Sequence, residues 1–191
     1  MGNKAALILD LSRELMEIVE TKIPGVLVVK PQVFGDARGY FQETYQADRY
    51  REAGIDATFV QDNVSFSQKG VLRGLHFQEP HPQGKLVYVL QGEVFDVAVD
   101  IRRDSPTFGQ WVGEYLSSEN HHQLWVPPGF AHGFCVTSET ALFAYKCSGY
   151  YNPATEHCIV WNDNDLAITW PIKKPLVSSK DQQGAPFSSF V

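Results

Sequence analysis

Several signals that mark common classes of protein are missing from this sequence of 191 residues. No basic run offsets its formal net charge of -6, which argues against nonspecific binding to nucleic acid or to an anionic membrane. No apolar run approaches the roughly 18 to 20 residues that span a bilayer. The apolar start, Ala5 to Leu9, is followed at once by charged residues and lacks the cleavage site of a signal peptide. We therefore expect a soluble, cytoplasmic protein whose partners include no nucleic acid and no membrane.

Cysteine and the common catalytic signatures are also scarce. The three cysteines, Cys135, Cys147 and Cys158, lack the spacing of a zinc site or of a disulfide framework, so we expect reduced structural thiols. The sequence has no GxGxxG fingerprint, no phosphate-binding glycine-rich loop and no Ser-His-Asp or Cys-His signature. Nucleophilic and dinucleotide-dependent chemistry both lose support.

What the sequence has in quantity is short segments of β type. A hydrophobic content of 43% with 13% aromatic residues is enough for the packed core of one sizeable domain. The segments are separated by turn signals such as Gly35-Asp36 and Pro127-Pro128-Gly129, a spacing that predicts an antiparallel sandwich or barrel. The predicted strands are Val26 to Val29, Tyr40 to Tyr45, Thr58 to Ser67, Val71 to Phe77, Leu86 to Leu90, Val94 to Ile101, Trp111 to Leu116, His122 to Val126, His132 to Val136, Ala141 to Cys147 and His157 to Trp161.

Helices are predicted in two places only. One covers Gln46 to Ala53 and ends at Gly54, and an amphipathic helix is expected within Lys4 to Thr21. The C-terminal flank from Lys173 to Val191 mixes Pro, Ser, Gly and Gln without a period, so its composition predicts a loop, although it carries Lys180-Asp181.

One predicted strand carries charged residues into hydrophobic surroundings. With a period of two, Val71 to Gln78 would place His76 on one face with Gly74 and Gln78, and Arg73 on the other. Buried charges need partners, so we expect a wet or liganded cavity, with Gly74 leaving room for a ligand beside His76.

The next segment is expected to complete this cavity. Gly84 to Val99 reads as two strands joined by a turn at Gln91-Gly92-Glu93, a hairpin that would present Lys85 near His76. His76 alone could equally be a core histidine, but Arg73 and Lys85 make that interpretation weaker. A metal site is not expected, because the histidines and the acidic residue of His76 to His81 do not share a face.

Two further pairs of residues have alternative roles. Tyr145 and Tyr151 could pack as ordinary aromatic residues, or one phenol could donate a proton while the other ring stacks on a base. Arg38 and Glu43 could be solvated surface charges, or they could bind a diphosphate and a sugar hydroxyl.

Taken together, six motifs closely resemble those of the dTDP-4-dehydrorhamnose 3,5-epimerase family, and the resemblance runs from about Met16 to Asp181. It implies an all-β, cupin-like jelly roll with a few short flanking helices, a homodimer with shared site residues, and no metal or nicotinamide cofactor. Family chains begin near Met16, so residues 1–15 are expected to be a helical extension and residues 16–191 a single domain. The motifs are Phe34 to Phe41, Val60 to Asn63, Leu72 to Gln78, Gln83 to Val87, Gly92 to Asp100 and Gly129 to Phe134.

The resemblance also implies a reaction. Family members invert C3 and C5 of dTDP-4-dehydro-6-deoxy-glucose on the route to dTDP-L-rhamnose, which supplies cell-surface polysaccharides. By resemblance, His76 is the base, Asp181 orients it, Lys85 stabilises an enolate oxygen and Tyr145 is the proton donor. Tyr151 would stack on thymine. The matched substrate contacts are Arg38, Glu43, Gln61, Asp62, Asn63, Arg73, His132, Glu156 and Lys180.

Three alternatives remain open at the level of sequence. A related enzyme of another deoxysugar pathway would invert C3 alone with much of the same machinery, although Tyr145 favours inversion at both carbons. A noncatalytic sugar-nucleotide binding module would have lost the base or its partner. A metal-dependent cupin would bind a stoichiometric metal ion.

Overall fold

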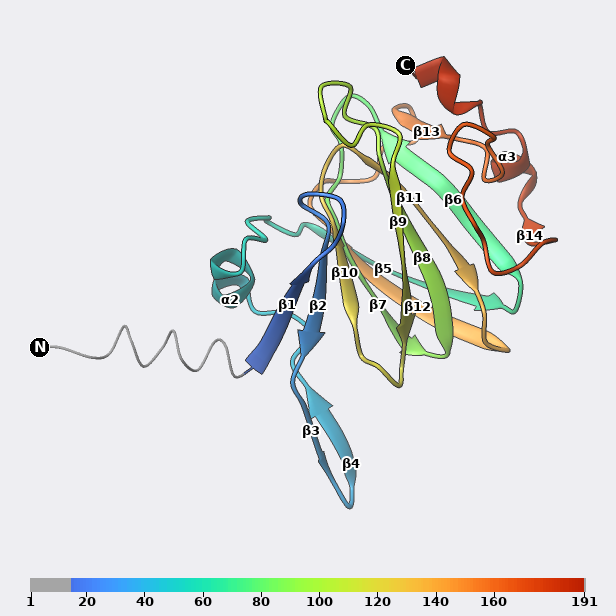
Figure 1. Ribbon diagram of the computed structural model, residues 1–191. Helices are drawn as coiled ribbons and strands as arrows, with labels where there is room; N and C mark the ends of the chain where they lie inside the picture. Colours follow the sequence, from blue (N-terminus) through green and yellow to red (C-terminus); the bar gives the residue numbers. More distant parts are fainter. Residues whose placement is uncertain (1–14, 191) are drawn as a thin grey trace, which may run out of the picture.

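The computed structural model describes residues 15–190 and consists mainly of strands (Figure 1). Within that range no helix is long and apolar enough to cross a membrane. Helices are short: α2 (Ala47–Glu52), α3 (Ser179–Gln182) and the 3-10 helix η1 (Phe187–Phe190). The strands are β1 (Met16–Glu20), β2 (Leu27–Pro31), β3 (Val33–Asp36), β4 (Gly39–Gln42), β5 (Gln61–Gln68), β6 (Val71–Gln78), β7 (Lys85–Gln91), β8 (Glu93–Asp100), β9 (Trp111–Ser117), β10 (Gln123–Val126), β11 (Phe130–Val136), β12 (Thr140–Cys147), β13 (Glu156–Cys158) and β14 (Leu176–Val177).

Two large sheets form the body of the molecule (Figure 1). The first has the order β1-β2-β10-β7-β12-β5, and the second has the order β13-β6-β11-β8-β9 with β14 added in parallel to β6. Leu124 and Phe143 of the first sheet pack with Leu116 and Phe134 of the second in one core, so the sheets lie face to face. This all-β jelly-roll sandwich confirms the expected fold class.

The outer faces of both sheets are also covered, which explains why β8 and β11 are buried almost throughout. The C-terminal segment packs Leu166 and Phe187 against Leu75 and Val97 of the second sheet. Helix α2 and its flanks pack on the first sheet. Burying one large apolar side chain contributes roughly 1.5 to 3 kcal/mol, so these layers fix both sheets in place.

A small two-stranded sheet stands apart from this body. Strands β3 and β4 pair with each other alone and form an arm that projects from the end of the first sheet (Figure 1). Phe34, Tyr40 and Phe41 on the arm are all at least half exposed. The arm therefore offers apolar surface away from the core.

Two sequence predictions about secondary structure near the chain ends were wrong. Met16–Glu20 is a strand rather than the end of a helix, because it pairs with Leu27–Pro31 and packs Ile18 and Val19 against apolar clusters. Residues 1–14 lie outside the described residues. They include the rest of the helix predicted from Lys4 and all but the last residue of the expected helical extension 1–15. The C-terminal flank is not simply a loop, since β14, α3 and η1 lie within it; elements of two to four residues leave no readable period.

The predicted hairpin of β7 and β8 was also wrong. The two strands follow one another in sequence but belong to different sheets, β7 beside β10 and β12, and β8 beside β11 and β9. Gly92 joins them with a φ of +82°, and a Cβ there would lie 2.0 Å from the Thr140 carbonyl oxygen. The turn carries the chain across the sandwich.

The predicted helix Gln46 to Ala53 is confirmed, with Gln46 as N-cap of α2 and Ala53 as C-cap.

Candidate active site

A one-residue bulge in β6 determines which side chains reach the interior. His132 of β11 pairs with His76, and Phe134 pairs with Arg73, so two steps along β11 match three along β6. Cross-strand partners share a face, which places Arg73 and His76 on the same face of the sheet. The predicted alternation, with Arg73 opposite to His76, was therefore wrong.

Gly74 lies inside this bulge for a steric reason. Its φ is +134°, and a Cβ would lie 2.6 Å from the Cα of Gly133 in β11. The space beside Gly74 is filled by backbone and not by a ligand, contrary to the sequence prediction. Glycine is required here so that β6 and β11 can approach each other closely.

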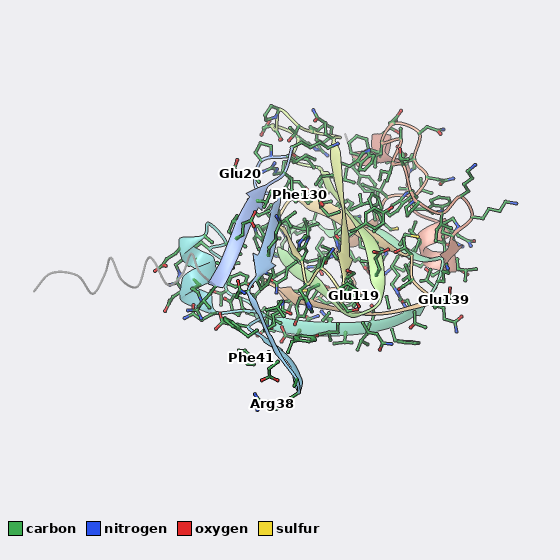
Figure 2. The ribbon with its side chains drawn as sticks, turned by 60° about the horizontal axis from the view of Figure 1, so that its bottom comes forward. Glu20, Arg38, Phe41, Glu119, Phe130 and Glu139 are labelled. Carbon is green, nitrogen blue, oxygen red and sulfur yellow. The ribbon has the colours of Figure 1, made fainter. Side chains whose placement is uncertain are left out.

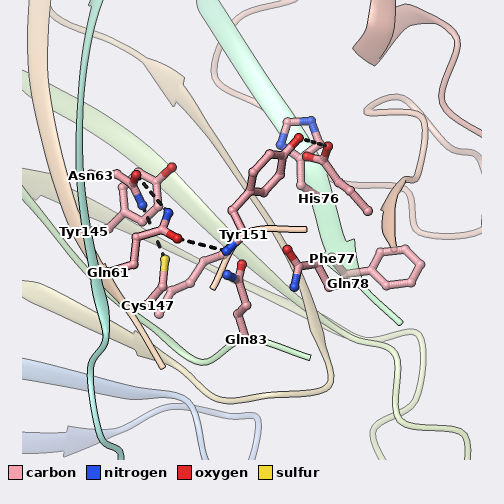
Figure 3. A pocket seen from close by; sticks show the side chains of 11 residues that line it. Gln61, Asn63, His76, Phe77, Gln78, Gln83, Tyr145, Cys147 and Tyr151 are labelled. Carbon is pink, nitrogen blue, oxygen red and sulfur yellow. Dashed lines mark hydrogen bonds between the residues drawn. The ribbon is translucent and has the colours of Figure 1, made fainter. Parts of the chain in front are cut away.

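A cavity of about 280 Å³ opens at the end of the sandwich where β5, β6, β7 and β12 meet (Figure 3). This volume is close to the lower limit for small-molecule sites. The cavity brings together seven of the predicted site residues. Its lining is Gln61, Asn63, His76, Phe77, Gln78, Gln83, Lys85, Tyr145, Cys147, Tyr151 and Glu156.

His76 at this cavity is hydrogen-bonded to Asp181, with 2.6 Å between Nε2 and Oδ1. Asp181 is buried at the start of α3, where Ser178 caps the helix and the Gly74 N–H donates to Oδ2 at 3.4 Å. Burial opposes ionisation of Asp181, but the His76 ring, the Gly74 N–H and Ser178 outweigh it and hold the pKa of Asp181 below its usual range. An ionised Asp181 keeps the proton on Nε2, which leaves Nδ1 free to accept one.

Lys85 supplies the cation of the cavity. It begins β7, and its cross-strand partner in β12 is Cys147. Burial lowers the pKa of Lys85, while Cys147, Asp96 and Glu156 act in the opposite direction. A cation held at a cavity wall can stabilise negative charge that develops on a ligand oxygen.

Two tyrosines differ in their surroundings within the cavity (Figure 3). Burial raises the pKa of Tyr145, so its phenol stays neutral and can donate a proton. Tyr151 is half exposed, and its hydroxyl donates to Glu156 Oε2 at 2.8 Å. Glu156 in turn forms an ion pair with Lys180. Tyr151, Glu156 and Lys180 thus form one polar cluster beside His76.

The neighbouring residues Gln61, Asp62 and Asn63 of β5 do not act as a unit. Gln61 and Asn63 face the cavity, and the Gln61 amide donates to Asn63 Oδ1 at 3.1 Å. Asp62 points to the other face, where it pairs with Lys146 at 3.0 Å. Successive side chains of a strand point to opposite faces, so three consecutive residues cannot all face one cavity. Of the three predicted substrate contacts, only Gln61 and Asn63 face the cavity of this chain.

Four other predicted residues neither line the cavity nor form a side-chain hydrogen bond to a residue that lines it. Arg73 donates a hydrogen bond from Nε to Ser67 Oγ at 3.2 Å. The positive charge of Arg73 acts to lower the pKa of Tyr145, but burial outweighs it and the pKa is raised overall. His132 is buried in the sandwich and is hydrogen-bonded to Asp96 at 2.9 Å.

The other two, Arg38 and Glu43, lie in a different part of the molecule. Arg38 is at the tip of the β3–β4 arm, pairs with Asp36 and points away from the body (Figure 2). Glu43 pairs with Arg49 of α2. Neither residue reaches the cavity of its own chain.

The site residues predicted from the sequence do not include four residues of the lining, Phe77, Gln78, Gln83 and Cys147. Cys147 follows Tyr145 at a spacing of two on β12, a signal that could have placed it on the same face. Gln78 and Gln83 hold the segment after β12: Gln83 donates to the Gly149 carbonyl at 2.6 Å, and Gln78 Oε1 accepts from the Asn152 N–H at 2.9 Å. Gln78 follows His76 at the same spacing of two on β6, whereas Gln83 lies in a loop where no periodic pattern predicts the direction of its side chain.

The arrangement suits a reaction in which a proton leaves a carbon next to a carbonyl group. An oriented imidazole can remove the proton, a cation can stabilise the enolate oxygen, and a neutral phenol can return a proton. These three groups, His76, Lys85 and Tyr145, converge on one cavity.

Comparisons with known proteins show which family the chain resembles over most of its length. A family model described as dTDP-4-dehydrorhamnose 3,5-epimerase matches residues 20–189. The chain is 56% identical over 175 residues to a Pseudomonas aeruginosa protein of that name, which covers 91% of this chain and 97% of the relative. It is 55% identical over 170 residues to one from Neisseria gonorrhoeae; that match covers 88% of this chain but 52% of the relative, so the chain spans about half the length of that relative.

A solved structure is similar over nearly the same range. It is described as dTDP-6-deoxy-D-glucose-3,5-epimerase from Legionella pneumophila in complex with dTDP-4-keto-L-rhamnose. The two chains are 55% identical and superpose with a TM-score of 0.89, over 91% of this chain and 93% of the other.

Proposed function

Because this chain belongs to the dTDP-4-dehydrorhamnose 3,5-epimerase family, we propose that it converts dTDP-4-dehydro-6-deoxy-α-D-glucose to dTDP-4-dehydro-β-L-rhamnose. The observation that carries the proposal is the convergence of His76 with its partner Asp181, Lys85 and Tyr145 on one cavity. A protein that only binds a sugar nucleotide would not need a base, a cation and a proton donor together at one cavity. The complex of the Legionella pneumophila relative with dTDP-4-keto-L-rhamnose supports the same choice of ligand.

The proposed chemistry follows from the C4 ketone of the substrate, which acidifies the protons on C3 and C5. His76 removes one of these protons through Nδ1, and the electron pair of the C–H bond moves to the C4 oxygen as an enolate. Lys85 stabilises this oxygen, an interaction typically worth roughly 3 kcal/mol. Tyr145 then donates its phenolic proton to the opposite face of the carbon, which inverts it. His76 then releases the proton that it took up to solvent, Tyr145 regains one from solvent, and the second carbon reacts in the same way.

The remaining cavity residues are proposed to hold the nucleotide and the sugar. Tyr151 would stack on thymine, since its ring is exposed at the rim. Gln61, Asn63 and Glu156 would accept and donate hydrogen bonds there, with Lys180 beside them. Arg73 and His132 match sugar or phosphate contacts of the family, and we propose that role for them although neither lines the cavity: Arg73 is exposed and His132 is hydrogen-bonded to Asp96.

A homodimer is part of the same proposal. Arg38 and Glu43 match nucleotide contacts of the family but lie outside the cavity of their own chain, with Arg38 on the projecting arm (Figure 2). Apolar side chains exposed together are typical of an interface, and Phe34, Tyr40 and Phe41 cover the arm. We infer that the arm delivers Arg38 to the cavity of a second copy of the chain.

The function is tested by incubating the purified protein with dTDP-4-dehydro-6-deoxy-glucose in D₂O and following deuterium at C3 and C5 by NMR. A downstream ketoreductase traps the product. Label at both carbons together with rhamnose formation supports the 3,5-epimerase. Label and inversion at C3 alone would identify the 3-epimerase of another deoxysugar pathway, and no exchange at either carbon would contradict the proposed activity.

A further inference from the structure

A thiol lies next to the proposed base and its partner. Cys158 of β13 is the cross-strand neighbour of His76 in β6, so their side chains share a face. The Cys158 Sγ is 3.9 Å from Asp181 Oδ1, the same oxygen that bonds His76 Nε2. One nitrogen, one sulfur and one carboxylate oxygen, from β6, β13 and α3, all lie within 4.8 Å of one another. The proposed reaction uses the imidazole and the carboxylate but has no role for the thiol.

These three donors form a set that suits zinc. Imidazole, thiolate and carboxylate bind Zn²⁺ at about 2.0 to 2.3 Å, so ligands of one tetrahedral ion are about 3.3 to 3.7 Å apart. The 3.9 Å between Cys158 Sγ and Asp181 Oδ1 is close to that separation. His76 and Asp181 would have to move apart by less than about 1 Å from their 2.6 Å contact. The His76 ring nitrogen and Cys158 Sγ, which lie within 4.8 Å of each other, would have to approach by up to about 1 Å.

We propose that His76, Cys158 and Asp181 bind Zn²⁺ or a similar thiophilic divalent cation, and that the bound ion inhibits the protein. The ion takes the place of the proton between His76 Nε2 and Asp181 Oδ1. His76 stays a neutral imidazole by carrying its ring proton on Nδ1 instead of Nε2, and Cys158 releases its thiol proton to the solvent, while Asp181 already carries its negative charge. The base then no longer has the partner that orients it, so proton removal from the substrate stops.

A second cavity gives an ion access to this cluster. It measures about 600 Å³, is lined by Cys158 together with residues of α3 and the segment up to Phe190, and does not include His76. It is open to solvent and large enough for the water ligand that would complete a tetrahedral ion. The ion can thus approach the thiol without passing through the proposed substrate cavity.

The other two thiols of the chain are worse ligands for a cation. Cys135 is fully buried in β11 and is no member of the cluster. Cys147 lies beside the Lys85 ammonium, which repels a divalent ion. Cys158 also has a cation nearby, Lys180, but Asp181 and Glu156 offset it with negative charge.

The first experiment measures binding without any enzyme assay. The full chain, freed of metal by a chelator, is titrated with Cd²⁺, a thiophilic substitute for Zn²⁺, and the ultraviolet charge-transfer band of a cadmium thiolate is followed. We expect saturation at one ion per chain, loss of the band in Cys158→Ser and Cys158→Ala, and a normal band in the matched control Cys135→Ala. No band in the wild-type chain, or a band that survives in both Cys158 variants, would overturn the proposal. So would a band that depends on Cys147.

The second experiment concerns inhibition and rests on the proposed function. Deuterium exchange into the substrate is measured with increasing Zn²⁺, each variant being compared with its own zinc-free rate. We expect zinc to lower the wild-type rate at least about tenfold, EDTA to restore it, and Cys158→Ser to need at least about tenfold more zinc. Equal sensitivity of the wild type and Cys158→Ser would refute an inhibitory site. If the zinc-free protein shows no exchange at all, the proposed function fails, and the cadmium titration still decides the metal site.

Discussion

At the scale of single residues, the proposed mechanism depends on one carboxylate that does not itself touch the substrate. Asp181 holds the Nε2 proton of His76 from a position at the start of α3, 105 residues away in sequence. Its own ionisation is maintained by the His76 ring, the Gly74 N–H and Ser178 against the effect of burial. The geometry makes Asp181 a positioning residue, and its loss should therefore affect the rate more than substrate binding.

Replacing Asp181 with Asn tests this. The amide is as large as the carboxylate but can donate a hydrogen bond to Nε2, which would favour the tautomer with its proton on Nδ1. We expect kcat to fall by roughly 10² to 10⁴ with a small change in KM. Asp165→Asn, at an exposed position in the C-terminal part of the chain, is the control and should react normally. A kcat within about twofold of the wild type would show that His76 needs no carboxylate.

At the scale of elements, the segment between β12 and β13 carries Tyr151, and β6 holds this segment through one side chain. Gln78 accepts from the Asn152 N–H at 2.9 Å and donates to the carbonyls of His81 at 3.2 Å and Tyr150 at 3.3 Å. Two of these bonds fix the backbone on both sides of Tyr151, and the third holds the loop that follows β6. The stacking ring is thereby placed before any ligand arrives.

Replacing Gln78 with Leu should loosen this segment without touching the base. We expect KM to rise by roughly tenfold while kcat changes by less than about threefold, because only the proposed nucleotide contact is displaced. Gln68→Leu, at the exposed end of β5, is the matched control. A fall in kcat at unchanged KM would assign Gln78 a different role.

The loop between β8 and β9 is locked in another way. Asp100 is fully buried and binds Arg102 through both carboxylate oxygens, with further bonds from Ser105 and Thr107. Burial alone would raise the pKa of Asp100, but these partners hold it well below its usual range. As the pH falls toward the unfolded-state pKa near 3.9, the unfolded chain takes up a proton that the folded chain does not. This interaction therefore stabilises the protein above that pH and is progressively lost below it.

Replacing Asp100 with Asn should lower the free energy of unfolding by about 2 kcal/mol at pH 7, because the hydroxyls and Arg102 lose a charged acceptor. The difference from the wild type should stay constant down to about pH 4 and shrink as the pH is lowered further to about 3. Urea unfolding at these pH values measures this, with the exposed Asp104→Asn as control. A difference that grows on acidification would contradict the lowered pKa.

At the scale of the whole molecule, the proposed dimer can be tested by mixing two inactive variants. His76→Ala removes the base, and Arg38→Ala removes the residue that the arm would deliver to its partner. If the site is shared, a mixed dimer has one site with both defects and one intact site. Random exchange of subunits should then restore about a quarter of the wild-type activity. No recovery, although mass measurements verify that mixed dimers have formed, would contradict the delivery of Arg38 to the site of the partner chain.

The sequence predicts single strands and helices better than it predicts the pairing of strands or the positions of distant site residues. Strands such as β6, β7 and β12 were predicted because their apolar residues follow the sheet, and α2 because its ends carry stop signals. Asp181 could be named only through the family resemblance, since a helix of four residues has no periodic signal. The bulge in β6 depends on its pairing with β11, which local sequence does not encode. For the same reason the turn at Gly92 was read as a hairpin, although it connects two sheets.

The order of strands in the first sheet has a consequence for the synthesis of the protein. β5 pairs only with β12, matching Gln68 with Thr140, so a nascent chain carries β5 unpaired until β12 leaves the ribosome. At typical rates of translation this takes on the order of 10 s. During that time the edge that bears Val64 and Phe66 is open to pairing with other chains. The newly made protein should therefore be most vulnerable to aggregation before its last third has been translated.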